Sequence, residues 1–199
     1  MITKDELKNR IDFAFFCAQD SFLNSGSFVP MLDITFKNSK GESTRAVVAL
    51  MGEAIDDRLK ILYSFGAIFG SQKNNGKVQE IENILMINEA WMSKHNKNVK
   101  KEDVPMPSKD PNRSEGLVCV GQTPEGLCLM KGKEIKRVLA GDKFNVELVE
   151  VNEGLDNYSE AESNLLQKFY DGFNGVVSKG IIFKDEDMPI NNSLKELFK

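Results

Sequence analysis

The chain is poor in the side chains that most often carry catalysis or metals, with one histidine and three cysteines in 199 residues. His95 lies in a stretch rich in Lys and Asn, which is typical of a solvated loop residue. Nucleophilic schemes that need a Ser/His/Asp or Cys/His set are therefore almost entirely excluded, and Lys, Tyr or paired carboxylates are left as candidates for catalysis. Zinc needs three or four protein ligands, which one histidine and scattered cysteines do not supply, so we expect no metal.

Phosphate-binding signals are also missing. Neither a Gly-x-Gly-x-x-Gly nor a Gly-Lys-Ser/Thr pattern occurs. The 26 Lys and Arg residues are outnumbered by 30 Asp and Glu, so the formal charge of -4 lacks the basic excess that drives nucleic-acid binding. The basic run from Lys94 to Lys101 contains no Phe, Tyr or Trp on which a base would stack. We expect no cofactor and no nucleic-acid partner.

Long apolar segments are absent as well. No stretch approaches the 18 apolar residues of a membrane-spanning helix, and the first six residues place acids where a signal peptide carries a basic segment. The three cysteines do not have the spacing of a disulfide framework, and buried thiols in a reducing compartment explain them. We therefore expect a cytoplasmic protein without a membrane partner; its oligomeric state is not indicated. Cys119 and Cys128 flank a hairpin turn, and their side chains share one sheet face if that turn has four residues.

The first segment with a clear pattern is helical. Thr3 and Glu6 form a capping box, and apolar residues then recur every three or four positions as far as Phe22. Gly26 marks the end. We expect this helix to be well buried, including three residues that widen its apolar face: Phe13, Phe16 and Cys17.

Alternating apolar and polar residues predict two strands over about 29–36 and 44–51. The helical period returns from about residue 55 to 70, where Gly66 and Gly70 lie four apart and permit close packing of another backbone. We interpret these two glycines as packing positions.

Four further strands are predicted, over about residues 81–92, 116–120, 127–130 and 144–151. A third helix follows, which we expect to begin at Ser159 with Glu162 as its capping-box partner. The order α-β-β-α-β-β-β-β-α predicts an α+β fold with an antiparallel sheet of about five to six strands and helices packed on it. We expect one domain over residues 1–180 and a C-terminal extension over 181–199 with a short, weak helix.

Between Trp91 and Glu115 lies a loop of about twenty residues, and loops of that length in compact domains are generally functional or disordered. Arg113 and Glu115 stand two apart where the next strand begins, so they project to the same face. Either Asp110 or Glu89 pairs with Arg113 and fastens the loop to the sheet, or these groups bind a ligand or partner. The candidate site residues are Glu89, Trp91, Ser108, Asp110, Arg113 and Glu115.

The strand end Glu89-Ala90-Trp91-Met92, followed by Pro107-Ser108-x-Asp110-Pro111-x-Arg113-x-Glu115, resembles the motif of a family of uncharacterised small prokaryotic proteins. The resemblance covers about residues 28 to 138. It departs from the family's pattern at Lys109 and Ser114, where acidic residues are more usual. It implies a family and no activity.

Two hypotheses remain. The first is a non-enzymatic binding or structural module that contacts another protein through Trp91 and the segment 107–115, since Trp and Arg dominate interface energetics. The second is an enzyme or small-anion-binding protein in which Arg113 holds the anion and Glu89, Asp110 and Glu115 supply acid and base groups beside Trp91. Convergence of these groups into a concave pocket favours the second, and mutual pairing favours the first.

Overall fold

A computed structural model describes residues 2–50, 55–92, 109–140, 143–150, 159–160, 163–184 and 198. Its helices and strands confirm the predicted α+β class and element order and add one two-residue strand, β7. The elements are α1 (Lys4–Ser25), β1 (Met31–Asn38), β2 (Ser43–Ala49), α2 (Ile55–Asn74), β3 (Val78–Met92), β4 (Ser114–Gln122), β5 (Cys128–Ala140), β6 (Lys143–Glu150), β7 (Ser159–Glu160) and α3 (Asn164–Val177).

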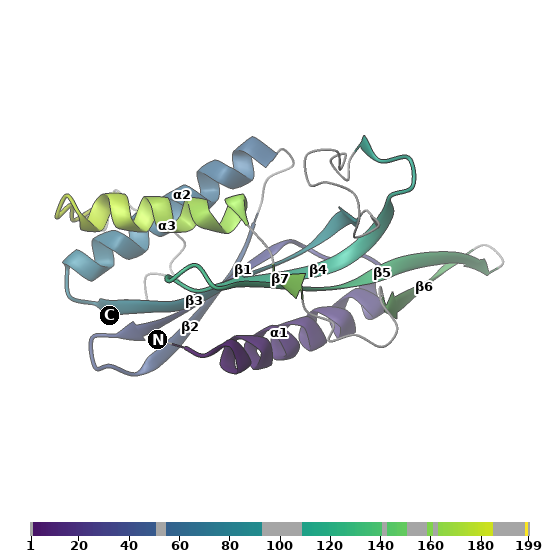
Figure 1. Ribbon diagram of the computed structural model, residues 1–199, viewed down its shortest axis with the longest axis horizontal. Coiled ribbons are helices and arrows are strands. Elements are labelled where there is room, and N and C mark those ends of the chain that lie inside the picture. Colours follow the sequence, from purple (N-terminus) through teal and green to yellow (C-terminus); the bar gives the residue numbers. More distant parts are fainter. Residues whose placement is uncertain are drawn as a thin grey trace.

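The strands form one antiparallel sheet in the order β2-β1-β3-β4-β5-β6, with β7 paired to β5. Figure 1 shows α2 and α3 side by side on one face of this sheet and α1 on the other. Because both faces are covered, central strand residues on either side are buried. In β3, Ile84 and Met86 face α2 and α3, whereas Leu85 and Ile87 face α1.

Helix α1 begins with the predicted capping box, in which Thr3 accepts a hydrogen bond from the amide of Glu6, and it ends at Gly26 with a φ of 75°. The prediction for the width of its buried face is wrong. Phe13 is 59 % exposed, Phe16 is 69 % exposed, and Cys17 is exposed. A single helix on one sheet face buries only the stripe that meets the sheet, and nothing in the described ranges covers the outer side of α1.

Glycines mark the closest approach of α2 and α3. A Cβ atom added to Gly66 would lie 1.9 Å from the carbonyl oxygen of Phe169, and one added to Gly172 would lie 2.1 Å from that of Tyr63. A Cβ on Gly70 would lie 2.6 Å from the carbonyl oxygen of Phe173. The interpretation of Gly66 and Gly70 as packing positions is confirmed.

The predicted start of α3 is wrong by several residues. The N-cap is Ser163, whose hydroxyl accepts a hydrogen bond of 3.1 Å from the amide of Leu166. Ser159 and Glu160 instead form β7 and pair with Met130 and Leu129. This pairing requires an extended backbone, so the helix starts at the next serine along the chain.

The described residues of the segment 181–199 contact α2 and β1. Residues 181–184 are neither helix nor strand, and the amide of Phe183 donates to the Ser71 hydroxyl at 2.7 Å. Phe198 is 4 % exposed, with its ring 5.2 Å from that of Phe69 and 6.0 Å from that of Phe36. The weak helix predicted for this extension falls on residues outside the described ranges, apart from Phe198.

The hairpin between β4 and β5 corrects a further expectation. Gln122 pairs with Cys128, so residues 123–127 form a loop of five residues rather than four. One extra residue reverses which face the following side chains occupy. Cys119 therefore lies in the core beside α1 and Cys128 in the core beside α2 and α3. Both thiols are free and buried, and burial raises the pKa of each.

Candidate functional site

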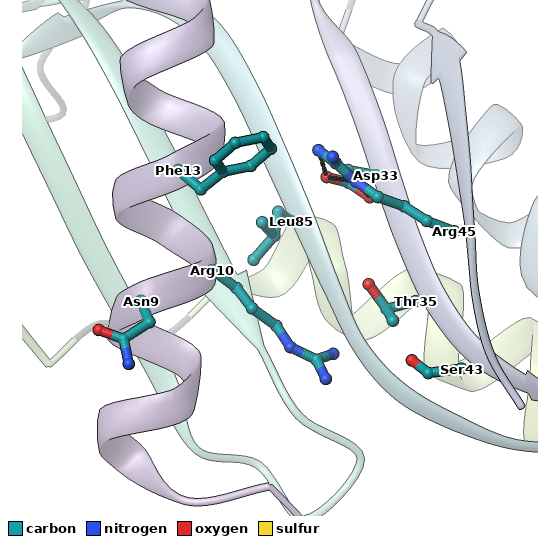
Figure 2. A pocket seen from close by; sticks show the side chains of 8 residues that line it. All are labelled: Asn9, Arg10, Phe13, Asp33, Thr35, Ser43, Arg45 and Leu85. Atoms are coloured by element: carbon teal, nitrogen blue, oxygen red, sulfur yellow. Dashed lines mark hydrogen bonds and ion pairs between the residues drawn. The ribbon is translucent and has the colours of Figure 1, made fainter.

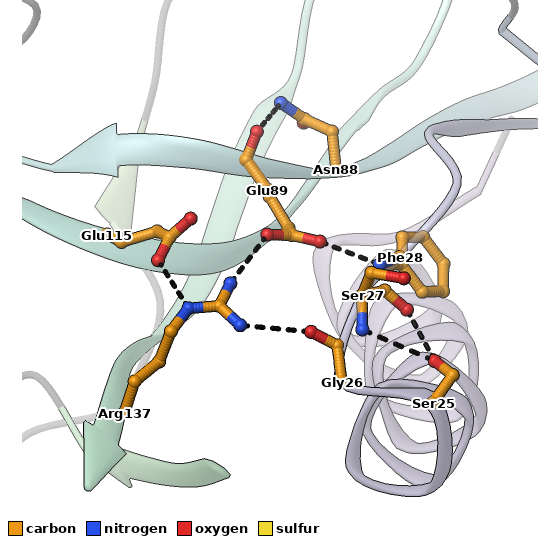
Figure 3. A network of polar contacts seen from close by, with 8 residues as sticks. All are labelled: Ser25, Gly26, Ser27, Phe28, Asn88, Glu89, Glu115 and Arg137. Carbon is orange, nitrogen blue, oxygen red and sulfur yellow. Dashed lines mark hydrogen bonds and ion pairs between the residues drawn. The ribbon is translucent and has the colours of Figure 1, made fainter. Parts of the chain in front are cut away.

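Three of the predicted site residues lie on adjacent strand ends and on the same sheet face as α1. Trp91 in β3 pairs with Glu115 in β4, and Glu89 pairs with Leu117. Leu117 is part of the core beside α1, so the alternation of strand side chains places Glu89, Trp91 and Glu115 on that face. This position is next to the end of α1 at Gly26 (Figure 3).

The carboxylates of Glu89 and Glu115 share one cation, Arg137 of β5, which the sequence did not single out. The Arg137 Nε donates to Glu115 Oε2 at 3.1 Å, and its Nη2 donates to Glu89 Oε2 at 3.3 Å. Its Nη1 donates to the carbonyl oxygen of Gly26 at 3.0 Å, as Figure 3 shows. The hydrogen bond to Glu115 raises the pKa of Arg137. One planar guanidinium thus joins two strands to the end of a helix.

Glu89 also fixes the chain that leaves α1. Its second oxygen, Oε1, accepts a hydrogen bond of 2.6 Å from the backbone amide of Phe28. Phe28 is itself buried in the core beside α1. Both carboxylate oxygens of Glu89 therefore have partners, and the connection from α1 to β1 is tied to β3.

Arg113 lies over the ring of Trp91, with its guanidinium carbon 4.5 Å from the ring centroid. This is within the range of a cation–π contact, which is worth roughly 0.5–1 kcal/mol at exposed sites. Trp91 is 49 % exposed, so one half of this large side chain faces solvent. We call Trp91 and Arg113 together the Trp91 surface.

Asp110 shapes the turn that leads into β4. It is 5 % exposed, and its Oδ1 accepts a hydrogen bond of 2.8 Å from the amide of Asn112. Its carbonyl oxygen accepts one of 3.2 Å from the amide of Arg113. Asp110 therefore positions the residue that stacks on Trp91. Ser108 and His95 lie outside the described residues.

The structure thus gathers five of the six candidates, and it joins two of them, Glu89 and Glu115, through a residue that was not predicted, Arg137. Either Asp110 or Glu89 was expected to pair with Arg113, and of these two Glu89 pairs with Arg137 instead. We predicted a strand that ended near Met130, whereas β5 continues to Ala140. The alternation of Ile135 with charged neighbours was the available signal, since it places Arg137 on the same face as Ile135.

Within the described ranges, no group of three or more His, Cys, Asp or Glu side chains is placed to hold a metal ion, and no helix is long and apolar enough to cross a membrane. Comparisons with family models, curated proteins and solved structures give no significant match.

Proposed function

We propose that this protein is a non-enzymatic binding module, and that it contacts a partner protein through the Trp91 surface. The observation that carries the proposal is the half-exposed ring of Trp91 with Arg113 stacked on it. We further propose that the chain belongs to the family of small prokaryotic proteins whose motif it resembles, because the motif residues Glu89, Trp91, Asp110, Arg113 and Glu115 build and support this surface.

Preorganisation supports a binding role for this surface. Trp91 is part of a paired strand, and the turn at Asp110 sets where Arg113 leaves the backbone. The Arg137 contacts to Glu89 and Glu115 tie together the ends of β3 and β4, where Trp91 lies. Side chains that are already ordered lose little conformational entropy when a partner binds. Trp and Arg are also the residue types that most often dominate the free energy of an interface.

The same contacts argue against the alternative, in which the acids perform catalysis. A general acid or base must reach the proton that it transfers. Both oxygens of Glu89 accept hydrogen bonds from the protein, Glu115 is paired with Arg137, and Asp110 is buried in a turn. These carboxylates have structural roles that account for their positions. The alternative placed a small anion on Arg113, whose guanidinium lies over the Trp91 ring and so forms part of the proposed contact surface.

We also propose a cytoplasmic location. The three cysteines are free, and the exposed thiol of Cys17 would be open to oxidation in an oxidising compartment. A reducing compartment is the setting in which such a thiol persists.

Affinity purification of the tagged full-length protein from its native host, followed by mass spectrometry, tests the binding role. Trp91→Ala should reduce recovery of a partner protein about tenfold or more, the loss expected for an interface hot spot. Ile182→Ala is the matched control, because Ile182 is 55 % exposed and its neighbours Ile181 and Phe183 are bonded to α2, on the sheet face opposite to Trp91. Melting curves of both variants confirm folding. Equal recovery with wild type and Trp91→Ala would refute the proposal.

A further inference from the structure

Strand β2 forms an open edge of the sheet. It lies outside β1 in the strand order and pairs with no other strand among the described residues. A pocket of about 370 Å³ separates it from α1, so this helix does not cover the edge (Figure 2). An open edge strand presents a row of unpaired backbone N–H and C=O groups to any other extended chain.

The hydrogen bonds at the two ends of the β1–β2 hairpin show which backbone groups of β2 are unpaired. The amide of Leu50 donates to the Pro30 carbonyl oxygen at 2.7 Å. At the other end, the amide of Asn38 donates to the Glu42 carbonyl oxygen at 3.0 Å. In an antiparallel pair, every second residue bonds to the partner strand, so the even-numbered residues of β2 bond to β1. The groups that point outward belong to four residues, all of them exposed: Ser43, Arg45, Val47 and Ala49.

The usual protection of an edge strand is missing from β2. Charged side chains, a proline or a bulge normally discourage pairing at an edge. The register of β2 with β1 is regular from Ser43 to Ala49, and the strand contains no proline. Its one charged residue is Arg45, whose guanidinium is turned toward the buried Asp33 and away from the edge (Figure 2). The strand at the other end of the order, β6, contains two glutamates and a lysine.

We propose that β2 pairs with β2 of a second copy of this chain, antiparallel and about a two-fold axis at Ala46. This register pairs all seven residues of the strand. Arg45 lies opposite Val47 of the second copy, and two-fold symmetry repeats this pair on the other side of the axis. The outward backbone groups of both residues then face each other and form hydrogen bonds. Ala46 lies opposite its own copy, where a small side chain allows close approach.

Charge and overlap select this register. An axis at Arg45 would place two guanidinium groups directly opposite each other, which is destabilising. An axis at Val47 would leave Ser43 and Thr44 opposite residues beyond the end of β2. Only the axis at Ala46 combines full overlap with the absence of a like-charge pair. The strand is therefore complementary to itself.

A second copy fits this edge better than an unstructured peptide does. Its β2 is already ordered, so pairing costs less conformational entropy. Val47 is 49 % exposed, and the aliphatic stem of Arg45 from the second copy would cover it. Pairing over one short strand buries less than the standard interface of about 1,600 Å², so the dimer is transient and forms only at high protein concentration.

Sedimentation velocity of the full-length protein between about 10 μM and 1 mM measures this association. The sedimentation coefficient should rise with concentration toward that of a dimer. Hydrogen exchange followed by NMR at both concentrations locates the contact. The amides of Arg45 and Val47 should gain protection at the higher concentration, whereas those of Ala46 and Val48, already bonded to β1, should change less. This alternation is specific to pairing at the edge.

Substitutions at Val47 test the register. Val47→Lys places a lysine opposite Arg45 of the second copy at two symmetric positions, so it should weaken dimerisation about tenfold or more. Val47→Glu places a carboxylate there and should dimerise about tenfold more tightly than Val47→Lys, an order that a general loss of stability does not produce. Val138→Lys is the matched control, because Val138 is 48 % exposed and lies on β5, beyond β1, β3 and β4. It should leave dimerisation unchanged.

A protein that stays monomeric up to about 1 mM would overturn the proposal, and so would an edge that binds only extended peptides of other proteins. A dimer in which the amides of Arg45 and Val47 gain no protection would overturn it too. Equal affinities of the Val47→Lys and Val47→Glu variants would contradict the register.

Discussion

Gly66→Ala should be strongly destabilising, because the backbones of α2 and α3 meet at this glycine. The added Cβ would lie 1.9 Å from the Phe169 carbonyl oxygen and 2.9 Å from the Phe173 amide nitrogen, whereas ordinary van der Waals contact begins at 3.4 Å. Both of these neighbours are backbone atoms, so no side-chain rotation relieves the clash. The two helices would have to move apart.

The magnitude follows from two opposing effects. Alanine is favoured over glycine inside a helix by about 1 kcal/mol, which offsets part of the loss. Separation of the helices loosens the contact of Phe69 with Phe169, whose rings are 5.9 Å apart in the core. Overpacking of this kind costs about 1–3 kcal/mol and occasionally more, and a clash with rigid backbone belongs at the upper end. We expect a net loss of about 2 kcal/mol and a melting temperature lower by about 4–8 °C.

Urea unfolding followed by circular dichroism measures this loss, and Gly175→Ala is its control. Gly175 is also inside α3, but the nearest atom to its added Cβ is the Tyr63 hydroxyl oxygen at 3.7 Å, an ordinary contact. Only the helix preference applies there, so this variant should be neutral or more stable by up to about 1 kcal/mol. Equal stability of the two variants would refute the close approach of α2 and α3.

Arg137→Ala should lower the free energy of unfolding by about 1–2 kcal/mol, because it removes three hydrogen bonds at a partly exposed site; an unchanged urea midpoint would contradict that role. Ellman's reagent should label one thiol in the native chain, that of Cys17, and reach Cys119 and Cys128 only on unfolding; faster labelling of the buried pair would contradict their burial. Burial raises the pKa of Tyr170. The buried, neutral tyrosine therefore contributes its full stabilisation below about pH 10, where a tyrosine in the unfolded chain ionises, and this stabilisation is lost as the pH rises further. Tyr170→Phe should therefore flatten the decline in stability between about pH 9 and 11, and an equal decline in both proteins would count against it.

Local signals predicted the start and end of α1, since the capping box of Thr3 and Glu6 and the left-handed Gly26 act within one turn of the backbone. The predicted start of α3 was wrong because Ser159, which has a capping-box partner in Glu162, lies in β7, and Ser163 caps the helix instead. The choice between Ser159 and Ser163 depends on the pairing of β7 with β5, about thirty residues earlier in the sequence, which no local pattern encodes.

Burial was predicted less well than element type. The helical period located Phe13 and Phe16 on α1 but did not show how wide a surface the sheet would offer them. The strand alternation placed Asp33 on the polar face of β1, yet its side chain is buried because Arg45 on the neighbouring strand pairs with it. In both cases the decisive neighbour comes from another element.

The motif residues lie at the end of one predicted strand and at the start of the next. Because these consecutive strands pair in the sheet, the sequence already brought the motif residues together. The identity of the cation that joins Glu89 and Glu115 could not be predicted from the order of the strands. Arg137 belongs to a third strand, and its register follows from the five-residue loop before Cys128. An error of one residue in that loop exchanges the two sheet faces, which is the same error that placed Cys119 and Cys128 together.

Helix α1 is tied to the sheet by arginine at two points along its length. Arg10 ties the helix to Glu82 near its start, and Arg137 ties Gly26 at its end. These positions are about 24 Å apart along the helix axis, from the rise of 1.5 Å per residue. Local chemistry therefore predicts that Arg10→Gln leaves recovery of the partner protein unchanged, whereas Trp91→Ala reduces it. Reduced recovery with Arg10→Gln would instead indicate that α1 moves as a rigid body on the sheet, so that a change near its start reaches the Trp91 surface through Arg137.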